Sequence, residues 1–433
     1  MINKTQYNGV TVLFRGTLPT NTQDFIQDVC RGVKPRGNYG SVVVLSDNER
    51  YYVTDHFSTY PIWYNQNDYD FFYQDIAKRT EIKTKEESFY NERKVMGGFT
   101  VSDMSPFKEI KRVPIDSIVH VKDGETKIIK HDTLIDSSVS SNGVEEVKTN
   151  FENFIAKNCA EKNVLFLSGG KDSTTIAHVV KKLGLANKFR FLSLWSPKAK
   201  QHEKEPVSRI AIHLDIPVEF IEVEYSGRIF DDETNARFFD FWTENTYSAK
   251  RKAIMDLGLT DSLCWSGEVG VGNMQSRYVL QYYAQKGYQK DKLARFSVNI
   301  CGTHRRSASV TDHALEYLDT PTEYERCVNH FESVLDNFDR HPDVINRILF
   351  HRLKDESAFR VYAYSQDDKI NWIHPFTNFN FINSCINWPS SIKFVNDRDK
   401  NIYRLLWPEM TTIPWEYAKS GLGIPASSKY NAN

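Results

Sequence analysis

Residues 164–180 constrain the fold of this chain more than any other stretch. They begin with the apolar run Val164-Leu165-Phe166-Leu167, and such a run is typical of a strand buried on both faces of a parallel sheet. The run stops at Ser168-Gly169-Gly170, and apolar residues then recur at helical spacing after Ser173. The pattern therefore predicts a strand, a glycine-rich turn and a helix in direct succession.

The turn itself has the chemistry of a phosphate site. Gly169 and Gly170 let the backbone bend sharply and approach a ligand with no Cβ in the way. Backbone N–H groups of such a turn, and of the helix start, carry partial positive charge and favour phosphate. Two hydroxyls, an ammonium group and a carboxylate that suits Mg²⁺ come from Ser168, Ser173, Lys171 and Asp172. In the alternative reading, an ordinary strand-to-helix turn, Asp172 only caps the helix and Lys171 is a solvated surface residue.

The composition excludes several classes of protein. With 433 residues, 40% hydrophobic and 13% aromatic, the chain suits two or three folded domains. A net charge of −1 gives no overall field for nucleic acid, so we expect no nucleic-acid partner. The six cysteines lack C-x-x-C spacing, which argues against a zinc site or a disulfide framework. Without a signal pattern or an apolar run of membrane-spanning length, the sequence predicts a cytoplasmic protein with no membrane partner.

Short β-branched or aromatic runs predict a β-rich domain over residues 1–140. The predicted strands are residues 10–14, 41–45, 51–54, 62–64 and 117–121. Residues 22–30 read as a helix with Asn21 or Thr22 as its cap, and residues 122–126 are typical of a hairpin turn. The small polar segment 137–143 then marks a boundary, which divides the chain into domains at 1–140 and 141–433.

Strands and helices alternate after this boundary. Helices are predicted at 144–159, 203–214 and about 232–257, and further strands at 189–195, 218–223 and 262–265. Such alternation predicts a parallel, doubly wound sheet with ligands at the carboxyl ends of its strands. Helical spacing dominates from about residue 279, with segments at 324–335, 344–352 and 357–364.

The loop from Ser168 to Ser173 resembles the pyrophosphate-binding loop, Ser-Gly-Gly-x-Asp-Ser, of enzymes that split ATP into AMP and pyrophosphate. Later landmarks occur in the order of the asparagine synthetase family, whose relatives include β-lactam synthetases and lasso-peptide cyclases. They are Ser266-Gly267-Glu268, Pro375-Phe376, Lys400, Arg404 and Lys419. Over about residues 145–428 the chain therefore resembles the synthetase domain of that family.

This resemblance implies a fold and a set of site residues. The fold is a doubly wound parallel sheet of the adenine nucleotide alpha hydrolase-like (PP-loop) type with a helical C-terminal part, preceded by a β-rich (α+β) degenerate Ntn-like domain. The implied ATP contacts are Leu167, Ser168, Gly169, Gly170, Lys171, Asp172, Ser173, Leu194, Ser266 and Gly267. Leu194 corresponds to the position that packs adenine, and Asp172 to the one that holds Mg²⁺.

The same resemblance implies a reaction, because amide formation requires an activated carboxylate. Transfer of AMP gives a mixed anhydride with a good leaving group and expels pyrophosphate. Lys419 corresponds to a lysine that stabilises charge on the adenylate. Glu268 corresponds to a glutamate that can take a proton from incoming ammonia as a general base.

Two departures bear on that reaction. Val271 stands where the family has a second magnesium carboxylate. Mg²⁺ held by Asp172 and the phosphates alone, and weak or altered catalysis, both fit this change. The acidic residues and the arginine of the family's Glu-x-Arg-x-Pro-Phe-Leu-Asp segment are also absent from residues 371–378. These positions help to shape the acceptor site, so the substrate need not be aspartate.

The N-terminal part departs further from the family. Residues 52–64 and 105–114 resemble segments of its glutaminase domain, where the nucleophile is a cysteine exposed as the N-terminal residue. Here Met1 is followed by Ile2, and the first cysteine is Cys30. We therefore expect no glutaminase activity, with ammonia or an amine as the nitrogen source. A homodimer is the default expectation for the family.

Three hypotheses follow. The first is an AMP-forming amide ligase that joins a small-molecule carboxylate to ammonia or an amine, with ATP and Mg²⁺. The second is an adenylating enzyme that acts on a nucleobase, nucleotide or peptide. The third is a catalytically degraded, nucleotide-binding interaction protein, which Val271 and the altered segment 371–378 favour.

Overall fold

The computed structural model describes residues 2–65, 86–96, 100–105, 107–108, 110–131, 143–195, 204–223, 245–268, 291–292, 294–295, 298, 321–336, 369–386, 403 and 406–413. The chain forms two compact units. Unit 1 comprises Met1–Ser140, Phe230–Trp242 and Ser276–Gln366, and unit 2 comprises Ser141–Ile229, Thr243–Gln275 and Asp367–Asn433. The domain ranges 1–140 and 141–433 stay a prediction.

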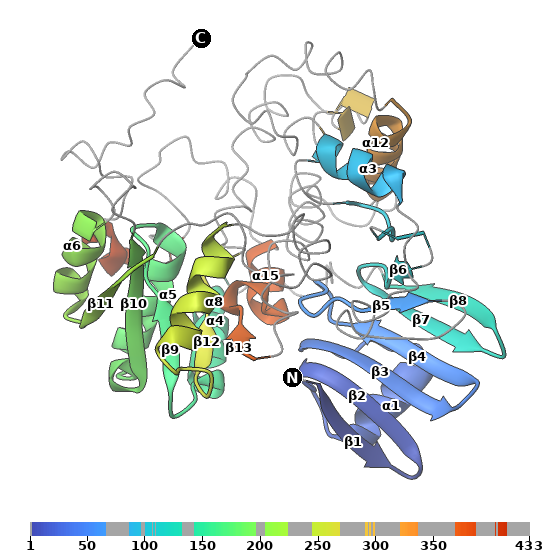
Figure 1. Ribbon diagram of the computed structural model, residues 1–433, viewed down its shortest axis with the longest axis horizontal. Coiled ribbons are helices and arrows are strands. Elements are labelled where there is room, and N and C mark those ends of the chain that lie inside the picture. The colour runs from blue at the N-terminus through green and yellow to red at the C-terminus, as the bar shows by residue number, and fades with distance from the viewer. Residues whose placement is uncertain are drawn as a thin grey trace. The chain divides into compact units, whose positions relative to one another are not determined.

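Unit 1 is built on a six-stranded antiparallel sheet in the order β1-β2-β3-β4-β7-β8 (Figure 1). Its strands are β1 (Asn3–Tyr7), β2 (Val10–Thr17), β3 (Asn38–Ser46), β4 (Glu49–Thr54), β7 (Ser117–Lys122) and β8 (Glu125–Lys130). Helix α1 (Thr22–Cys30) buries Phe25, Ile26 and Val29 in a core with residues of this sheet. A second, two-stranded sheet pairs β5 (Trp63–Asn65) with β6 (Ile110–Arg112), and α3 (Glu87–Met96) packs on α12 (Pro321–Asp336).

Local signals in unit 1 act as the sequence predicts. Asn21 is the N-cap of α1, and its side-chain oxygen accepts a hydrogen bond from the Asp24 N–H at 3.0 Å. The turn between β7 and β8 uses Asp123 and Gly124, both with positive φ (49° and 83°), as a tight hairpin requires. The predicted helix 22–30 and the predicted hairpin are therefore confirmed.

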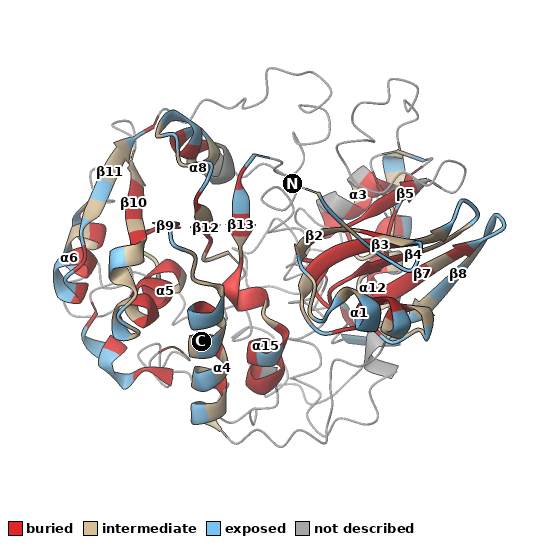
Figure 2. Ribbon diagram, turned by 90° about the horizontal axis from the view of Figure 1, so that it is seen from below, coloured by how far each residue is buried: buried red, intermediate tan, exposed pale blue. Residues whose placement is uncertain are grey.

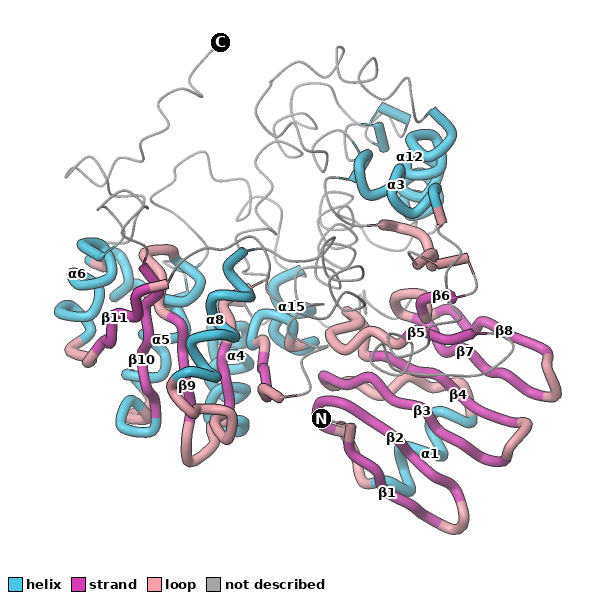
Figure 3. Tube along the Cα trace, viewed as in Figure 1, coloured by secondary structure: helices cyan, strands magenta, loops and turns pink. Residues whose placement is uncertain are grey.

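Unit 2 contains a five-stranded sheet in which every pair is parallel, in the order β11-β10-β9-β12-β13. The strands are β9 (Asn163–Phe166), β10 (Phe189–Trp195), β11 (Val218–Glu222), β12 (Leu263–Trp265) and β13 (Asn371–Ile373). Helices cover both faces of this sheet (Figure 2), and Figure 3 distinguishes them from the strands. On one face lie α4 (Val144–Asn158), α5 (Lys171–Lys182), α6 (Lys204–Leu214) and α15 (Phe379–Ile386), and on the other lies α8 (Asn245–Asp256). The predicted doubly wound α/β fold is confirmed, as is the β-rich character of the N-terminal part.

The strand order reverses beside β9. From β9 the chain adds β10 and then β11 on one side, and afterwards β12 and β13 on the other. A crevice commonly forms at such a switch point, beside the carboxyl ends of the two strands that flank it. Ligands of open parallel sheets bind at this position, so the topology directs attention to the residues after Phe166 and Trp265.

Asn163, at the start of β9, connects three strands at the opposite end of the sheet. The side chain is 3% exposed. Its Nδ2 donates to the carbonyl oxygens of Ala160 (2.7 Å) and Lys188 (3.1 Å), and its Oδ1 accepts from Trp265 Nε1 at 3.0 Å. Lys188 precedes β10 and Trp265 ends β12, so one amide links the central strand to both neighbours.

Some predicted helices cannot be compared with the structure, and some observed strands were not predicted. The predicted helices at 344–352 and 357–364 lie outside the described residues. Strands β1 and β13 have no predicted equivalent. Within the part of the chain that the structure describes, no helix has the length and apolar character needed to cross a membrane.

Replacing Asn163 should destabilise unit 2. In Asn163→Ala the buried Trp265 Nε1 and two carbonyls lose their partner, at a cost of about 2–3 kcal/mol in the free energy of unfolding. Urea denaturation measures this difference. The control is Asn371→Ala, an exposed position at the start of β13, which should change the free energy by less than ~0.5 kcal/mol. Equal effects of the two variants would contradict this role of Asn163.

Candidate functional site

The predicted phosphate loop lies where β9 ends and α5 begins. Gly170 is the N-cap residue of α5, with extended backbone (φ −83°, ψ 164°), so the connection is very short. Ser168 N–H donates to Ser173 Oγ at 3.0 Å, and the hydroxyl oxygens of Ser168 and Ser173 lie 2.9 Å apart. Gly170 N–H in turn donates to Ser168 Oγ at 3.2 Å. These hydrogen bonds of Ser168 and Ser173 therefore fix the backbone conformation of the turn between β9 and α5.

The start of α5 presents its positive dipole end at this turn. The N-cap residue, Gly170, has no side chain with which to cap the helix, and Asp172 is the acidic residue of the first helical turn. N–H groups at a helix start favour a carboxylate or a phosphate. Tyr403 donates its hydroxyl hydrogen to Asp172 Oδ1, and Lys171 Nζ lies 5.9 Å from the centroid of the Tyr403 ring. A residue from far along the chain thus holds the Asp172 carboxylate beside the turn.

The loop after β12 lies directly against the start of α5. A Cβ added to Gly267 would lie only 2.9 Å from Ser173 N, a distance that real Cβ atoms do not adopt. Ser266 is buried, and its N–H donates to the carbonyl oxygen of Ile373 at 3.0 Å. Glu268 N–H donates to Ser266 Oγ at 3.2 Å. Glycine at 267 is therefore what allows the two loops to meet at the switch point.

A charged pair borders this loop. Lys250 on α8 lies 3.4 Å from Glu268 Oε1, and the two side chains are 12% and 17% exposed. Such partial burial makes their attraction stronger than that of a surface pair. The pairing places one anionic and one cationic group at the carboxyl end of β12.

His374 is buried at the end of β13, close to this pair. Burial and, secondarily, the positive charge of Lys250 lower its pKa to about 3. The ring is therefore neutral near pH 7, and its backbone carbonyl accepts from Thr377 Oγ1 at 2.8 Å. His374 belongs to the core of unit 2 in this structure.

The residues singled out from the sequence fall into three groups. One group surrounds the switch point and comprises Leu167, Ser168, Gly169, Gly170, Lys171, Asp172, Ser173, Ser266, Gly267 and Glu268. Leu194 is half-buried towards the end of β10, opposite Ile221 of β11. Lys419 and Val271 lie outside the described residues, as do Lys400 and Arg404. The assignment of these residues to ATP or Mg²⁺ stays a prediction.

Sequence reasoning missed Tyr403 and Lys250. The signal for Tyr403 was its position one residue before Arg404, in the basic segment that the family resemblance marks. Lys250 had no local signal, because it is one of several cations on its helix and meets Glu268 only through the fold. Among the described residues, no group of three or more His, Cys, Asp or Glu could hold a metal ion.

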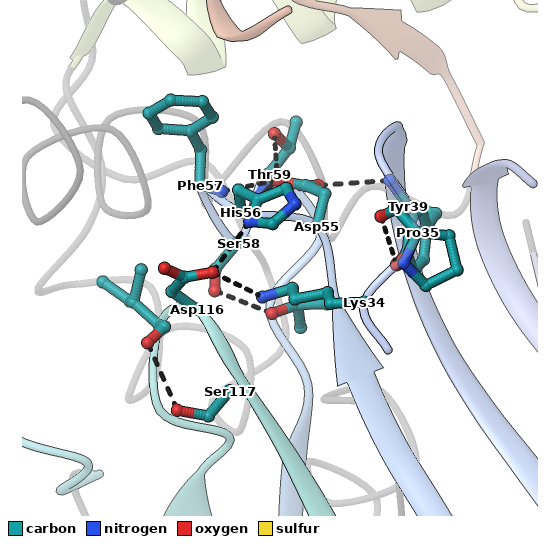
Figure 4. A network of polar contacts seen from close by, with 12 residues as sticks. Lys34, Pro35, Tyr39, Asp55, His56, Phe57, Ser58, Thr59, Asp116 and Ser117 are labelled. Atoms are coloured by element: carbon teal, nitrogen blue, oxygen red, sulfur yellow. Dashed lines mark hydrogen bonds and ion pairs between the residues drawn. The ribbon is translucent and has the colours of Figure 1, made fainter. Parts of the chain in front are cut away.

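Unit 1 contains a buried polar network around the segment that resembles the glutaminase domain (Figure 4). The Asp55 carboxylate accepts hydrogen bonds from the N–H groups of Phe57 (2.8 Å), Thr59 (3.1 Å) and Tyr39 (3.1 Å). Burial raises the pKa of Asp55 to about 6, and the hydrogen bonds from Phe57 and Thr59 oppose this shift. Asp55 therefore organises the turn that follows β4.

A second buried contact in Figure 4 joins His56, Asp116 and Lys34. His56 Nδ1 lies 2.8 Å from Asp116 Oδ1, and Lys34 Nζ lies 3.5 Å from the same oxygen. All three side chains are at most 2% exposed. A substrate has no access to side chains so deeply buried, so their role is to fix the fold of unit 1.

Cys30, the first cysteine of the chain, ends α1. Burial is the main cause that raises the pKa of its thiol. A raised thiol pKa lowers the fraction of thiolate, which is the nucleophilic form. Its environment is therefore unlike that of an activated catalytic cysteine.

Comparisons with known proteins give matches to a family model and to a solved structure. Residues 143–259 match the family model described as NAD synthase, which is just over a quarter of the chain and includes the loop from Ser168 to Ser173. A search of curated proteins found no match. Among solved structures, the chain matches the crystal structure of NAD+ synthetase from Burkholderia pseudomallei at 12% identity. This alignment covers 51% of the present chain and 89% of the other chain, and its TM-score is 0.20.

The buried His374 should make unit 2 less stable in acid. Its folded pKa of about 3 lies below the ordinary value of 6.5, so its contribution is present above pH 6.5 and is lost as pH falls towards 3. Between pH 7 and pH 5 the loss should be about 2 kcal/mol of unfolding free energy. Urea unfolding at the two pH values, with wild type and His374→Asn, measures it. An identical acid loss in both proteins would contradict the assignment.

Proposed function

We propose that this chain is an ATP-dependent ligase that adenylates a carboxylate, releases pyrophosphate and transfers the acyl group to ammonia or an amine. The observation that supports it most is the geometry of the switch point. There a Ser-Gly-Gly-x-Asp-Ser loop, the start of α5 and the Ser266-Gly267-Glu268 loop lie in contact. Such a crevice beside a helix start suits the phosphates of a nucleotide.

In this proposal ATP lies with its phosphates over the loop from Ser168 to Ser173 and its adenine near Leu194. The donor set at Asp172 fits Mg²⁺, because this ion prefers oxygen ligands and is commonly held by one or two carboxylates together with phosphates. Mg²⁺, when bound, would neutralise phosphate charge. The backbone N–H groups at the start of α5 would favour the same charge from the protein side.

The chemistry then proceeds in two balanced steps. An oxygen of the substrate carboxylate attacks the α-phosphorus, the bond from that phosphorus to the bridging oxygen breaks, and pyrophosphate leaves. The nitrogen of ammonia or an amine next attacks the acyl carbon, and AMP leaves. Glu268 accepts the proton that the nitrogen loses, and Lys250 lies 3.4 Å from Glu268 Oε1, where its positive charge faces the carboxylate. Lys419 is proposed to stabilise the adenylate.

The nitrogen source in this proposal is ammonia or an amine and not glutamine. Unit 1 offers a half-buried Cys30 with a raised thiol pKa, which is poorly suited to hydrolyse an amide. We propose that unit 1 is a scaffold. The acid is proposed to differ from aspartate, because residues 371–378 lack the charged side chains of the asparagine synthetase segment.

A second candidate is favoured by the NAD synthase match over residues 143–259. It keeps the same reaction and changes the acid, which would then be the carboxylate of a nucleotide. Both candidates require ATP cleavage between the α- and β-phosphates, so the proposal of an ATP-dependent amide ligase does not depend on the choice between them.

Pyrophosphate release tests the proposal. The protein, with ATP, Mg²⁺ and ammonium, is incubated with amino acids, dicarboxylates and a nicotinic acid dinucleotide in separate reactions. We expect pyrophosphate with at least one acid, and Asp172→Ala should lower its rate at least ~100-fold while circular dichroism stays unchanged. The control, Asp261→Ala, removes an exposed aspartate of unit 2 and should leave the rate unchanged. ATP binding without pyrophosphate under all conditions would instead favour a catalytically degraded nucleotide-binding protein.

Adding a methyl group at position 267 should weaken nucleotide binding. The added methyl group of Gly267→Ala would lie 2.9 Å from Ser173 N, so the backbone of one loop must move. We expect at least ~10-fold weaker binding of ATP with Mg²⁺ by isothermal titration calorimetry, because loop geometry positions the phosphates. Unchanged affinity in a folded variant would separate this loop from the nucleotide site.

A further inference from the structure

The hydroxyl of Tyr403 contacts the one carboxylate of the phosphate loop. Tyr403 and Asp172 are 231 positions apart in the chain, yet the hydroxyl donates a hydrogen bond to Asp172 Oδ1. A hydrogen bond from a neutral hydroxyl to a carboxylate is charge-assisted and stronger than one between two neutral groups. This contact joins a residue from the C-terminal part of unit 2 to the start of α5.

The surroundings of Tyr403 hold its ring rigidly. The side chain is fully buried, and its ring centroid lies 5.8 Å from that of Phe376 in η3 (Pro375–Thr377). The carbonyl oxygen of Tyr403 accepts from Trp407 N–H at 2.8 Å, and Trp407 Nε1 donates to Glu152 Oε1 on α4 at 2.9 Å. The hydroxyl therefore stands at a position set by three packed elements.

We propose that Tyr403 is a positioning residue that orients the Asp172 carboxylate for a nucleotide-bound Mg²⁺. A carboxylate offers two oxygens, and a hydroxyl that holds Oδ1 fixes the rotation of the group and hence the position of Oδ2. This inference rests on the proposed function, because it takes Asp172 as the ligand of the magnesium ion.

Two other roles make different predictions. If Tyr403 only packs against Phe376, removal of its hydroxyl changes nothing at the nucleotide site, since the ring remains. If the hydroxyl competes with Mg²⁺ for Asp172, its removal tightens magnesium-dependent binding. The positioning role alone predicts weaker binding that depends on both Mg²⁺ and Asp172.

The experiment measures binding of α,β-methylene ATP, which cannot be cleaved between the α- and β-phosphates, by isothermal titration calorimetry. Full-length wild type, Tyr403→Phe, Asp172→Asn and the double variant are each titrated with MgCl₂ and again with EDTA. Tyr403→Phe should weaken binding about 10–100-fold with MgCl₂ and less than about twofold with EDTA, the range typical of residues that support a metal ligand. In the Asp172→Asn background, Tyr403→Phe should add less than about twofold, because the effect acts through Asp172.

Tyr64→Phe is the matched control, since Tyr64 is another buried tyrosine, in unit 1, and should leave binding unchanged. Thermal melts of all variants show whether the ring alone preserves the fold. A Tyr403→Phe variant that binds like wild type in MgCl₂, binds more tightly, or loses the same affinity in EDTA would overturn the positioning role. Wild type that shows no magnesium-dependent binding would instead overturn the proposed function.

Discussion

The parallel pairing of β9 with β10 on one side and β12 on the other is the constraint on which unit 2 depends. The two registers align Asn163 with Phe189 and with Leu263, so the three strands begin at the same level, and Trp265 at the end of β12 lies opposite Leu165 of β9. This alignment brings the turn after Phe166 and the turn after Trp265 to one edge of the sheet. Asn163 reinforces it from the other end, where a single amide contacts the backbone before β10 and the indole of β12. The direct result is that Gly267 lies against the start of α5.

Much of this arrangement could be predicted from local sequence, because local sequence determines it. A buried parallel strand reads as a continuous apolar run, and β10 begins and ends at the residues expected. The turn after β9 is recognisable because glycines and serines at fixed spacing allow only a few backbone paths. Even the cap of α1 follows from one asparagine at the right place.

Other features could not be predicted, for identifiable physical reasons. Strand β1 is an edge strand whose residues are mostly exposed, so its sequence, NKTQY, lacks the alternation by which strands are recognised. Strand β13 has three residues and begins with an exposed asparagine. The contact between Tyr403 and Asp172 depends on packing across the whole unit, and nothing near either residue marks the other.

The two carboxylates at the switch point each lie beside a group that interacts with their negative charge. Glu268 faces Lys250, and Asp172 has Tyr403 as a hydrogen-bond donor, with Lys171 above the same ring. His374 stays neutral beside Lys250 because burial outweighs any gain from protonation. In unit 1 the polar groups are instead enclosed, as Asp55 and Asp116 are. Similar side chains are therefore fully enclosed in unit 1, whereas Lys250 and Glu268 in unit 2 stay partly exposed.

The long separation between Asp172 and Tyr403 also determines when their hydrogen bond can form during synthesis. The loop after β9 leaves the ribosome well before Phe376, Tyr403 and Trp407, because Tyr403 lies 231 positions after Asp172. Until Tyr403 has been synthesised this hydrogen bond cannot form, and contacts between residues so far apart in the chain are slow to form. The sheet of unit 2 is likewise incomplete until β13 has been synthesised, because β13 pairs with β12, more than a hundred positions earlier in the chain.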